Sequence, residues 1–231
     1  MKQLSSVSIL CAVVAVAFCA GAAWAEEGFE PIFDGKTLEG WEGKEGFWSV
    51  EDGAITGKTS EENPLDSNTF LIWRAAKVAD FELRFKIRLV GGNTGLQFRS
   101  KEVEPFVIAG YQADFDAAGE WVGVLYDEKG RALLAERGTR VIIWGDGSKQ
   151  VMEQITPEKD ILDSIKKEDW NDYTIIAKGN RIIQKINGLT TVDVTDAEEG
   201  DKRKEGLLAL QLHTGEPMKV QIKDVRLKTI K

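Results

Sequence analysis

Polar residues alternate with apolar ones in three short stretches of the chain, 96–99, 110–116 and 207–213. On a β-strand, alternate side chains point to the same side of the sheet, so each stretch gathers its polar residues on one face. The polar members of the three stretches are Gln97, Arg99, Gln112, Asp114, Asp116, Gln211 and His213. Together they supply a guanidinium, carboxylates, amides and the single imidazole of the chain. If the strands are neighbours, such groups could orient a sugar, stabilise an oxyanion and transfer a proton.

A solvated sheet face with cross-strand ion pairs would explain any one of these residues, but their convergence favours a site. A second candidate segment follows at 126–131, with Tyr126, Asp127, Glu128 and Arg131 as its members. An exposed turn is the alternative interpretation of this segment, and alternation does not decide which of the two acidic residues faces inward. Trp121, Trp73 and Trp144 are candidates for stacking on sugar rings.

The composition is that of a globular domain. The 231 residues are 42% hydrophobic and 29% charged, with 30 Lys and Arg against 38 Asp and Glu, a net charge of −8. This excludes a mostly disordered chain and suits a single domain. The nearest approach to a basic run, 202–204, ends at Glu205. We expect no nucleic-acid partner, because phosphate neutralisation needs clustered lysines and arginines.

The first 25 residues have the pattern of a signal peptide. Lys2 is followed by an apolar run over 7–20 and by Ala-Trp-Ala at 23–25, the small-residue pattern of a cleavage site. The alternatives are an uncleaved membrane anchor and a lipoprotein cut before Cys19, where bulky Phe18 is unfavourable. We therefore expect an exported protein, periplasmic or secreted and free of the membrane after cleavage, whose single domain spans 26–231.

Several site chemistries are excluded by residue counts. The two cysteines, Cys11 and Cys19, lie in the leader, so the mature domain has no thiol nucleophile and no cysteine metal site. His213 is the single histidine, which excludes histidine-rich zinc sites. A serine triad would have to use His213, and no G-x-S-x-G motif accompanies it.

The chain is predicted to be all-β. Residues 81–89 alternate strictly between apolar and charged side chains, as in a half-buried antiparallel strand. Asn187-Gly188 is a strong hairpin signal, and a change of spacing near 223–224 suggests a bulge. Pro157 and the spacing of the following apolar residues predict one short helix near 157–166. Many short strands imply a sandwich, jelly roll or barrel, with a binding trough if its polar face is concave.

Eight short motifs, in order, resemble those of the 3-keto-disaccharide hydrolase domain family. They include FDGKTLEGW at 33–41, WSVEDG at 48–53, GNTGLQFR at 92–99, GYQAD at 110–114, YDEKGR at 126–131 and the LALQLH ending at 208–213. The resemblance covers nearly all of the mature chain, although 132–168 follows no motif. It implies a concanavalin-like jelly-roll sandwich of two curved antiparallel sheets, and action on 3-keto-glycosides.

The polar positions that the resemblance matches are Asn93, Arg99, Gln112, Asp114, Asp127, Glu128, Arg131, Gln211 and His213. Gln112 stands where many members have Glu, so a mechanism that uses a base there would not transfer. The implied chemistry removes the acidic C2 hydrogen of the ketosugar, expels the C1 substituent and adds water. Substrate-binding residues are expected at Asn93, Gln97, Gln112, Tyr126, Arg131, Gln211 and Trp121.

Each catalytic role retains alternatives at this stage. Asp114 or His213 could be the base, and Asp127 or Glu128 could protonate the leaving group. Arg99 is the natural stabiliser of the enolate, since a guanidinium stays charged. No cofactor is required, although a divalent cation held by carboxylates and His213 could replace Arg99. The alternative function is a non-catalytic glycan-binding module, and in either case the partner is a carbohydrate. The oligomeric state does not follow from the sequence.

Export gives the first testable prediction. Mass spectrometry of native mature protein should find Glu26 at the N-terminus, because cleavage is expected after Ala25. An intact Met1, or a diacylglyceryl group on Cys19, would contradict it.

Overall fold

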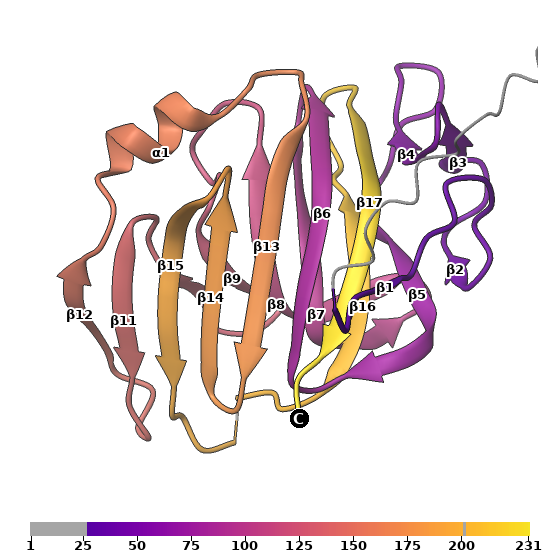
Figure 1. The fold of residues 1–231 in the computed structure, drawn as a ribbon. Helices are drawn as coiled ribbons and strands as arrows, with labels where there is room; N and C mark the ends of the chain where they lie inside the picture. The colour runs from indigo at the N-terminus through magenta and orange to yellow at the C-terminus, as the bar shows by residue number, and fades with distance from the viewer. Residues whose placement is uncertain (1–26, 201) are drawn as a thin grey trace, which may run out of the picture.

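Two β-sheets packed face to face form the protein (Figure 1). The computed structural model describes residues 27–200 and 202–231, so the predicted signal peptide lies outside the described residues. The ten-stranded sheet has the order β12-β11-β15-β14-β13-β6-β17-β4-β3, with β1 paired to β17, and the seven-stranded sheet has the order β10-β9-β8-β7-β16-β5-β2. The all-β sandwich prediction is confirmed. Pairing is antiparallel except between β11 and β15, which run parallel.

The strands of the ten-stranded sheet are β1 (Glu30–Pro31), β3 (Trp48–Glu51), β4 (Ala54–Lys58), β6 (Phe81–Val90), β11 (Thr139–Ile143), β12 (Lys149–Gln154), β13 (Asn171–Lys178), β14 (Arg181–Ile186), β15 (Leu189–Asp196) and β17 (Lys219–Thr229). Those of the seven-stranded sheet are β2 (Trp41–Glu42), β5 (Thr69–Val78), β7 (Asn93–Glu104), β8 (Val107–Asp116), β9 (Leu125–Glu128), β10 (Ala132–Ala135) and β16 (Gly206–Leu212). The helix α1 (Glu158–Ser164) lies within the predicted range 157–166. No helix among the described residues is long and apolar enough to cross a membrane.

Alternation along the strands places the core between the two sheets. In β6 the odd positions from Phe81 to Leu89 are at most 3% exposed, while the charged even positions are half-buried. The turn of the β14–β15 hairpin has Asn187 at φ 49° and Gly188 at φ 85°, a left-handed pair that suits Asn-Gly. The bulge predicted near 223–224 is present, since the pairing of β17 with β6 shifts register between Lys223 and Arg226.

On the seven-stranded sheet the same alternation produces an outer polar face. Tyr111, Ala113 and Phe115 of β8 point into the core, so the residues between them point away from it. Leu208, Leu210 and Leu212 of β16 are likewise core residues. This outer face of β7, β8, β9 and β16 carries the candidate site.

The close approach of β16 to β7 leaves no room for a side chain at Gly206. A Cβ there would lie 2.3 Å from the carbonyl carbon of Arg99 and 2.4 Å from the carbonyl oxygen of Ser100. Gly206→Ala should lower the free energy of unfolding by ~1–3 kcal/mol, as expected for overpacking against rigid backbone. Denaturant unfolding measures the change.

Gly145→Ala is the matched control, because the nearest neighbouring atom would lie 4.0 Å from its Cβ. Its effect should stay within roughly 0.5 kcal/mol of wild type. Equal stability of the two alanine variants would show that β16 does not pack against β7 as described.

Candidate active site

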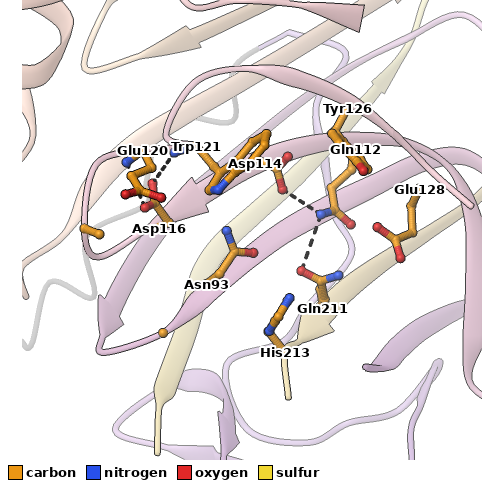
Figure 2. A pocket seen from close by; sticks show the side chains of 12 residues that line it. Asn93, Gln112, Asp114, Asp116, Glu120, Trp121, Tyr126, Glu128, Gln211 and His213 are labelled. Atoms are coloured by element: carbon orange, nitrogen blue, oxygen red, sulfur yellow. Dashed lines mark hydrogen bonds between the residues drawn. The ribbon is translucent and has the colours of Figure 1, made fainter. Parts of the chain in front are cut away.

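A polar cavity of about 360 Å³ opens on the outer face of the seven-stranded sheet (Figure 2). Its lining residues are Gly92 and Asn93 at the start of β7, Gln112, Asp114 and Asp116 of β8, Ala118, Glu120 and Trp121 of the following loop, Tyr126 and Glu128 of β9, and Gln211 and His213 at the end of β16. The side chains come from four adjacent strands, β9, β8, β7 and β16, and from the loop that follows β8. The structure therefore brings together, in one cavity, the residues that strand alternation placed on one face: Gln112, Asp114, Gln211 and His213.

A chain of hydrogen bonds runs beneath the cavity and ends on Asp114. Ser100 Oγ donates to Gln97 Oε1 at 2.7 Å, and Gln97 Nε2 donates to Gln112 Oε1 at 2.8 Å. Gln112 Nε2 then donates to Asp114 Oδ1 at 2.6 Å and to Gln211 Oε1 at 3.3 Å. These bonds fix the orientation of each amide. The Gln211 carboxamide thus uses its oxygen within the chain, which leaves its NH₂ group free to donate.

The Asp114 carboxyl is the most strongly perturbed group of the cavity. It is 4% exposed, and burial raises its pKa well above the ordinary value. The nearby carboxyls of Glu128 and Asp116 raise the pKa further, against the opposing hydrogen bond from Gln112. Oδ2 of Asp114 has no hydrogen-bond partner among the residues that the structure describes. A neutral carboxyl at this position can donate a hydrogen bond into the cavity.

Two groups on β9 are also perturbed. Burial raises the pKa of Glu128, although Lys129 and His213 act in the opposite direction. Burial likewise raises the pKa of Tyr126, with the charges of Glu128 and Asp114 adding to the effect. Glu128 remains half-buried, so a ligand can reach it. A carboxyl with a raised pKa is suited to donate a proton near neutral pH.

One nitrogen of the His213 imidazole is hydrogen-bonded to the backbone, and the other has no described partner. Nδ1 lies 2.5 Å from the carbonyl oxygen of Thr214, which can only accept, so Nδ1 carries the hydrogen. Nε2 of the neutral ring is then an acceptor without a described partner. Figure 2 shows the ring between Asn93 and Gln211 at the cavity. His213 is thus oriented to take up a proton through Nε2.

Asp116 organises the loop that forms one rim of the cavity. Its two carboxylate oxygens accept hydrogen bonds from the backbone N–H groups of Glu120 and Trp121, both at 2.9 Å. Trp121 is 40% exposed, and its ring meets that of Tyr126 edge to face with centroids 6.0 Å apart. An indole held at the rim of a polar cavity can stack on a sugar ring.

Arg99 is not in this cavity, so the prediction that it shares a face with Asp114 and His213 is wrong. Its backbone takes φ 48°, and the pairing of β7 with β8 shifts register between Phe98 and Lys101. Alternation therefore fails at this position. The buried guanidinium donates to the carbonyl oxygens of Ala79 and Gly179 and pairs with Asp80 at 2.8 Å.

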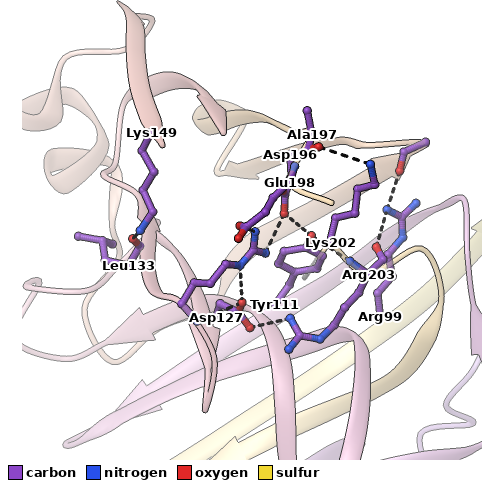
Figure 3. Close-up of polar contacts among 12 residues, drawn as sticks. Arg99, Tyr111, Asp127, Leu133, Lys149, Asp196, Ala197, Glu198, Lys202 and Arg203 are labelled. Atoms are coloured by element: carbon purple, nitrogen blue, oxygen red, sulfur yellow. Dashed lines mark hydrogen bonds and ion pairs between the residues drawn. The ribbon is translucent and has the colours of Figure 1, made fainter. Parts of the chain in front are cut away.

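Asp127 and Arg131 are also misplaced by the sequence prediction, since neither lines the cavity. Asp127 lies instead against Arg203 (Figure 3). β9 alternates, so Tyr126 and Glu128 face the cavity while Asp127 is 1% exposed on the other side. Asp127 accepts from Arg131 at 2.8 Å and from Arg203 at 2.7 Å. Arg131 also pairs with Asp196 at 2.7 Å and with Glu198 at 2.6 Å. This network ties β9 to the end of β15 and to the loop before β16.

The remaining predicted residues divide by position. Asn93, Gln112, Tyr126, Gln211 and Trp121 line the cavity as expected, whereas Gln97 is fully buried beneath it and supports Gln112. Sequence reasoning missed Glu120, and it left Asp116 without a role. The Asp-x-x-x-Glu-Trp spacing of the loop gave no recognisable signal. Trp73 is buried, and neither it nor Trp144 lines this cavity.

Within the described residues, no group of three or more histidine, cysteine, aspartate or glutamate side chains could hold a metal ion.

Residues 28–228 match the model of the 3-keto-alpha-glucoside-1,2-lyase-like domain. The chain belongs to that family. No curated protein gives a significant match.

Solved structures share the fold at low sequence identity. The carbohydrate-binding module CBM66 from Bacillus subtilis aligns at 18% identity and TM-score 0.54, over 82% of this chain and 96% of the module. A proposed glycosyl hydrolase from Parabacteroides distasonis aligns at 14% identity and TM-score 0.58, over 87% of this chain and 99% of that one. A Bacillus subtilis protein of unknown function with a galectin-like fold aligns at 12% identity and TM-score 0.55, over 83% and 90% of the two chains. At these identities the likeness concerns the fold alone.

The raised pKa of Asp114 predicts a pH-dependent stability difference. The folded protein holds this proton more tightly than the unfolded chain, whose carboxyl keeps a pKa near 3.8. The contribution of Asp114 to the free energy of unfolding is therefore full below about pH 4 and is lost as pH rises toward the folded-state pKa. Asp114→Asn keeps an acceptor for Gln112 and cannot ionise. Its stability relative to wild type should increase as pH rises from 4 to 9, as measured by urea unfolding.

Glu104→Gln is the control for this experiment, because Glu104 is exposed and outside the cavity. Its curve should run parallel to that of wild type. A parallel curve for Asp114→Asn as well would mean that the Asp114 carboxyl ionises as readily in the folded protein as in the unfolded chain.

Proposed function

We propose that this protein is an exported carbohydrate-active enzyme that cleaves 3-keto-glycosides by elimination and hydration, with net hydrolysis. Membership of the 3-keto-alpha-glucoside-1,2-lyase-like family supports the substrate class. The observation that carries the proposal is the meeting, in one cavity, of His213 with a free Nε2 and two carboxyls of raised pKa, Asp114 and Glu128. A binding module needs no such set of proton-transfer groups.

The reaction needs a base, an enolate stabiliser and an acid. A ketone at C3 of the sugar acidifies the hydrogen on C2. The base removes that proton, and the C2–H electron pair forms the C2–C3 double bond of the enolate. The enolate then returns its electrons, the C1–O bond breaks, and the leaving oxygen takes a proton. Water adds to C1 of the resulting enone while C2 is reprotonated, so atoms and charges balance.

His213 acts as the base in this proposal. Its Nδ1–H is held by the Thr214 carbonyl, so Nε2 accepts the C2 proton and later returns it. The same carbonyl also stabilises the imidazolium that forms, because it accepts from Nδ1 in both states. Asp114, the other candidate base, is disfavoured because burial raises its pKa and so favours the neutral carboxyl.

Asp114 takes the enolate-stabilising role that the sequence suggested for Arg99. A neutral carboxylic acid in a buried site can donate a strong hydrogen bond to an enolate oxygen, as in ketosteroid isomerase. The hydrogen bond from Gln112 holds Oδ1, so that Oδ2 is available for the donated proton. The free NH₂ of Gln211 is a second donor within the same cavity.

Glu128 acts as the acid that protonates the leaving oxygen. Its raised pKa and partial exposure suit that role, and after proton loss the carboxylate can activate the incoming water. Trp121 stacks on a sugar ring at the rim, and Asn93 binds hydroxyl groups. A non-catalytic glycan-binding module is the second candidate function, favoured by the exposed indole of Trp121.

Turnover of a 3-keto-glucoside by purified protein tests the proposal. His213→Gln and Glu128→Gln should each reduce kcat by a factor of ~10²–10⁴, the usual contribution of a general base or acid. A substrate with deuterium at C2 should react more slowly with wild type, because the C2–H bond breaks.

Three comparisons make this experiment decisive. Glu104→Gln should retain wild-type rates. Asp114→Ala should lose more activity than Asp114→Asn, because Asn can still donate a hydrogen bond to the enolate, whereas equal losses would point to Asp114 as the base. Binding of unoxidised glycan without turnover of any 3-keto-glycoside would instead establish the binding module.

A further inference from the structure

The cavity has carboxyl groups but no fixed cation. Asp114, Asp116, Glu120 and Glu128 border it, opposite the single imidazole of His213. In the part of the chain that the structure describes, none of these four carboxyls forms an ion pair. Lys129 influences the pKa of Glu128 from an exposed turn and does not line the cavity.

This absence of cations is local to the cavity. On the other side of β9, the carboxylates of Asp127, Asp196 and Glu198 are paired with Arg131 and Arg203 at 2.6–2.8 Å (Figure 3). The acidic residues on that side of β9 are thus paired with arginines, whereas those that line the cavity are not. A charged ligand entering the cavity would meet the negative field of the Asp116 and Glu120 carboxylates, which no lysine or arginine among the described lining residues offsets.

Two features show where a ligand group would meet this field. Asp116 holds the backbone of Glu120 and Trp121 through two hydrogen bonds of 2.9 Å, which places an exposed carboxylate beside an exposed indole. Deeper in, Asp114 is only 4% exposed, and its Oδ2 has no described partner. A cation beside Glu120 would also be attracted to the face of the Trp121 ring.

We propose that the cavity selects its glycoside by charge: it favours a leaving group that is uncharged or bears an ammonium, and it rejects one that bears a carboxylate, such as a uronic acid. A ligand carboxylate would be placed beside the like charges of Asp116 and Glu120, and such repulsion excludes a wrong ligand. An ammonium would gain the attraction of Glu120 and of the Trp121 ring. The choice of a ketosugar ligand rests on the proposed function, whereas the order of affinities by charge does not depend on turnover.

The experiment measures binding and turnover separately. Three phenyl 3-keto-glucosides are compared by calorimetry with the mature protein, one unsubstituted, one with a para-trimethylammonium group and one with a para-carboxylate. The carboxylate compound should bind at least 10-fold more weakly than the unsubstituted one, and the ammonium compound should bind more tightly. The differences should shrink between about 0.01 M and 1 M salt, where the Debye length falls from ~30 Å to ~3 Å.

A variant pair locates the effect. Glu120→Gln should reduce the ratio of affinities for the ammonium and carboxylate compounds, while Glu104→Gln, with the same change in net charge, should leave that ratio unchanged. Equal affinities for the three compounds, or tightest binding of the carboxylate, would overturn the charge selection. Binding in the expected order without product would support the charge selection and contradict the enzymatic function.

Discussion

The hydrogen bond from Gln112 to Asp114 is the interaction on which the rest of the site depends. The two side chains lie two residues apart on the outer face of β8, joined at 2.6 Å. Gly95 on β7 makes the pair possible, since a Cβ there would lie 2.5 Å from Gln112 Cγ and 2.9 Å from Asp114 Oδ1. Ser100, which begins the chain of hydrogen bonds, needs Gly110, whose Cβ would lie 2.2 Å from the serine Oγ. Two glycines thus make room for the polar chain that holds one buried carboxyl.

Strand alternation then separates the charges of the molecule into two environments. Asp127 and Glu128 are neighbours in sequence, yet the first enters an ion-pair network with Arg131 and Arg203 while the second faces the cavity. Each buried charge of this network has a partner, so that removal of one partner would leave an uncompensated buried charge. In the cavity, burial without a cationic partner raises the pKa of Glu128 instead. The same residue type therefore has opposite uses on the two faces of one strand.

Most of this arrangement could be predicted wherever the sequence obeys period two. Alternation correctly placed Gln112, Asp114, Gln211 and His213 on one face, because their strands are regular there. It failed at Arg99, where a left-handed residue inside β7 reverses the side-chain direction, and no local preference marks that position. Strands β10, β11 and β12 were not predicted, since the region 132–168 has no clear alternation. The rim loop was also missed, because its conformation depends on backbone hydrogen bonds to Asp116.

The position of Arg99 outside the cavity determines which chemistry the site can perform. A guanidinium beside Asp114 and Glu128 would favour their charged forms and lower both pKa values. Ionisation of the two groups would then be favoured, at the expense of a donor to the enolate and an acid for the leaving group. With Arg99 bound to Asp80 and to three backbone carbonyls, burial remains the largest influence on the pKa values of these carboxyls. The acid chemistry of the cavity and its proposed selectivity for charge therefore have one physical origin, the exclusion of fixed cations from a buried acidic site.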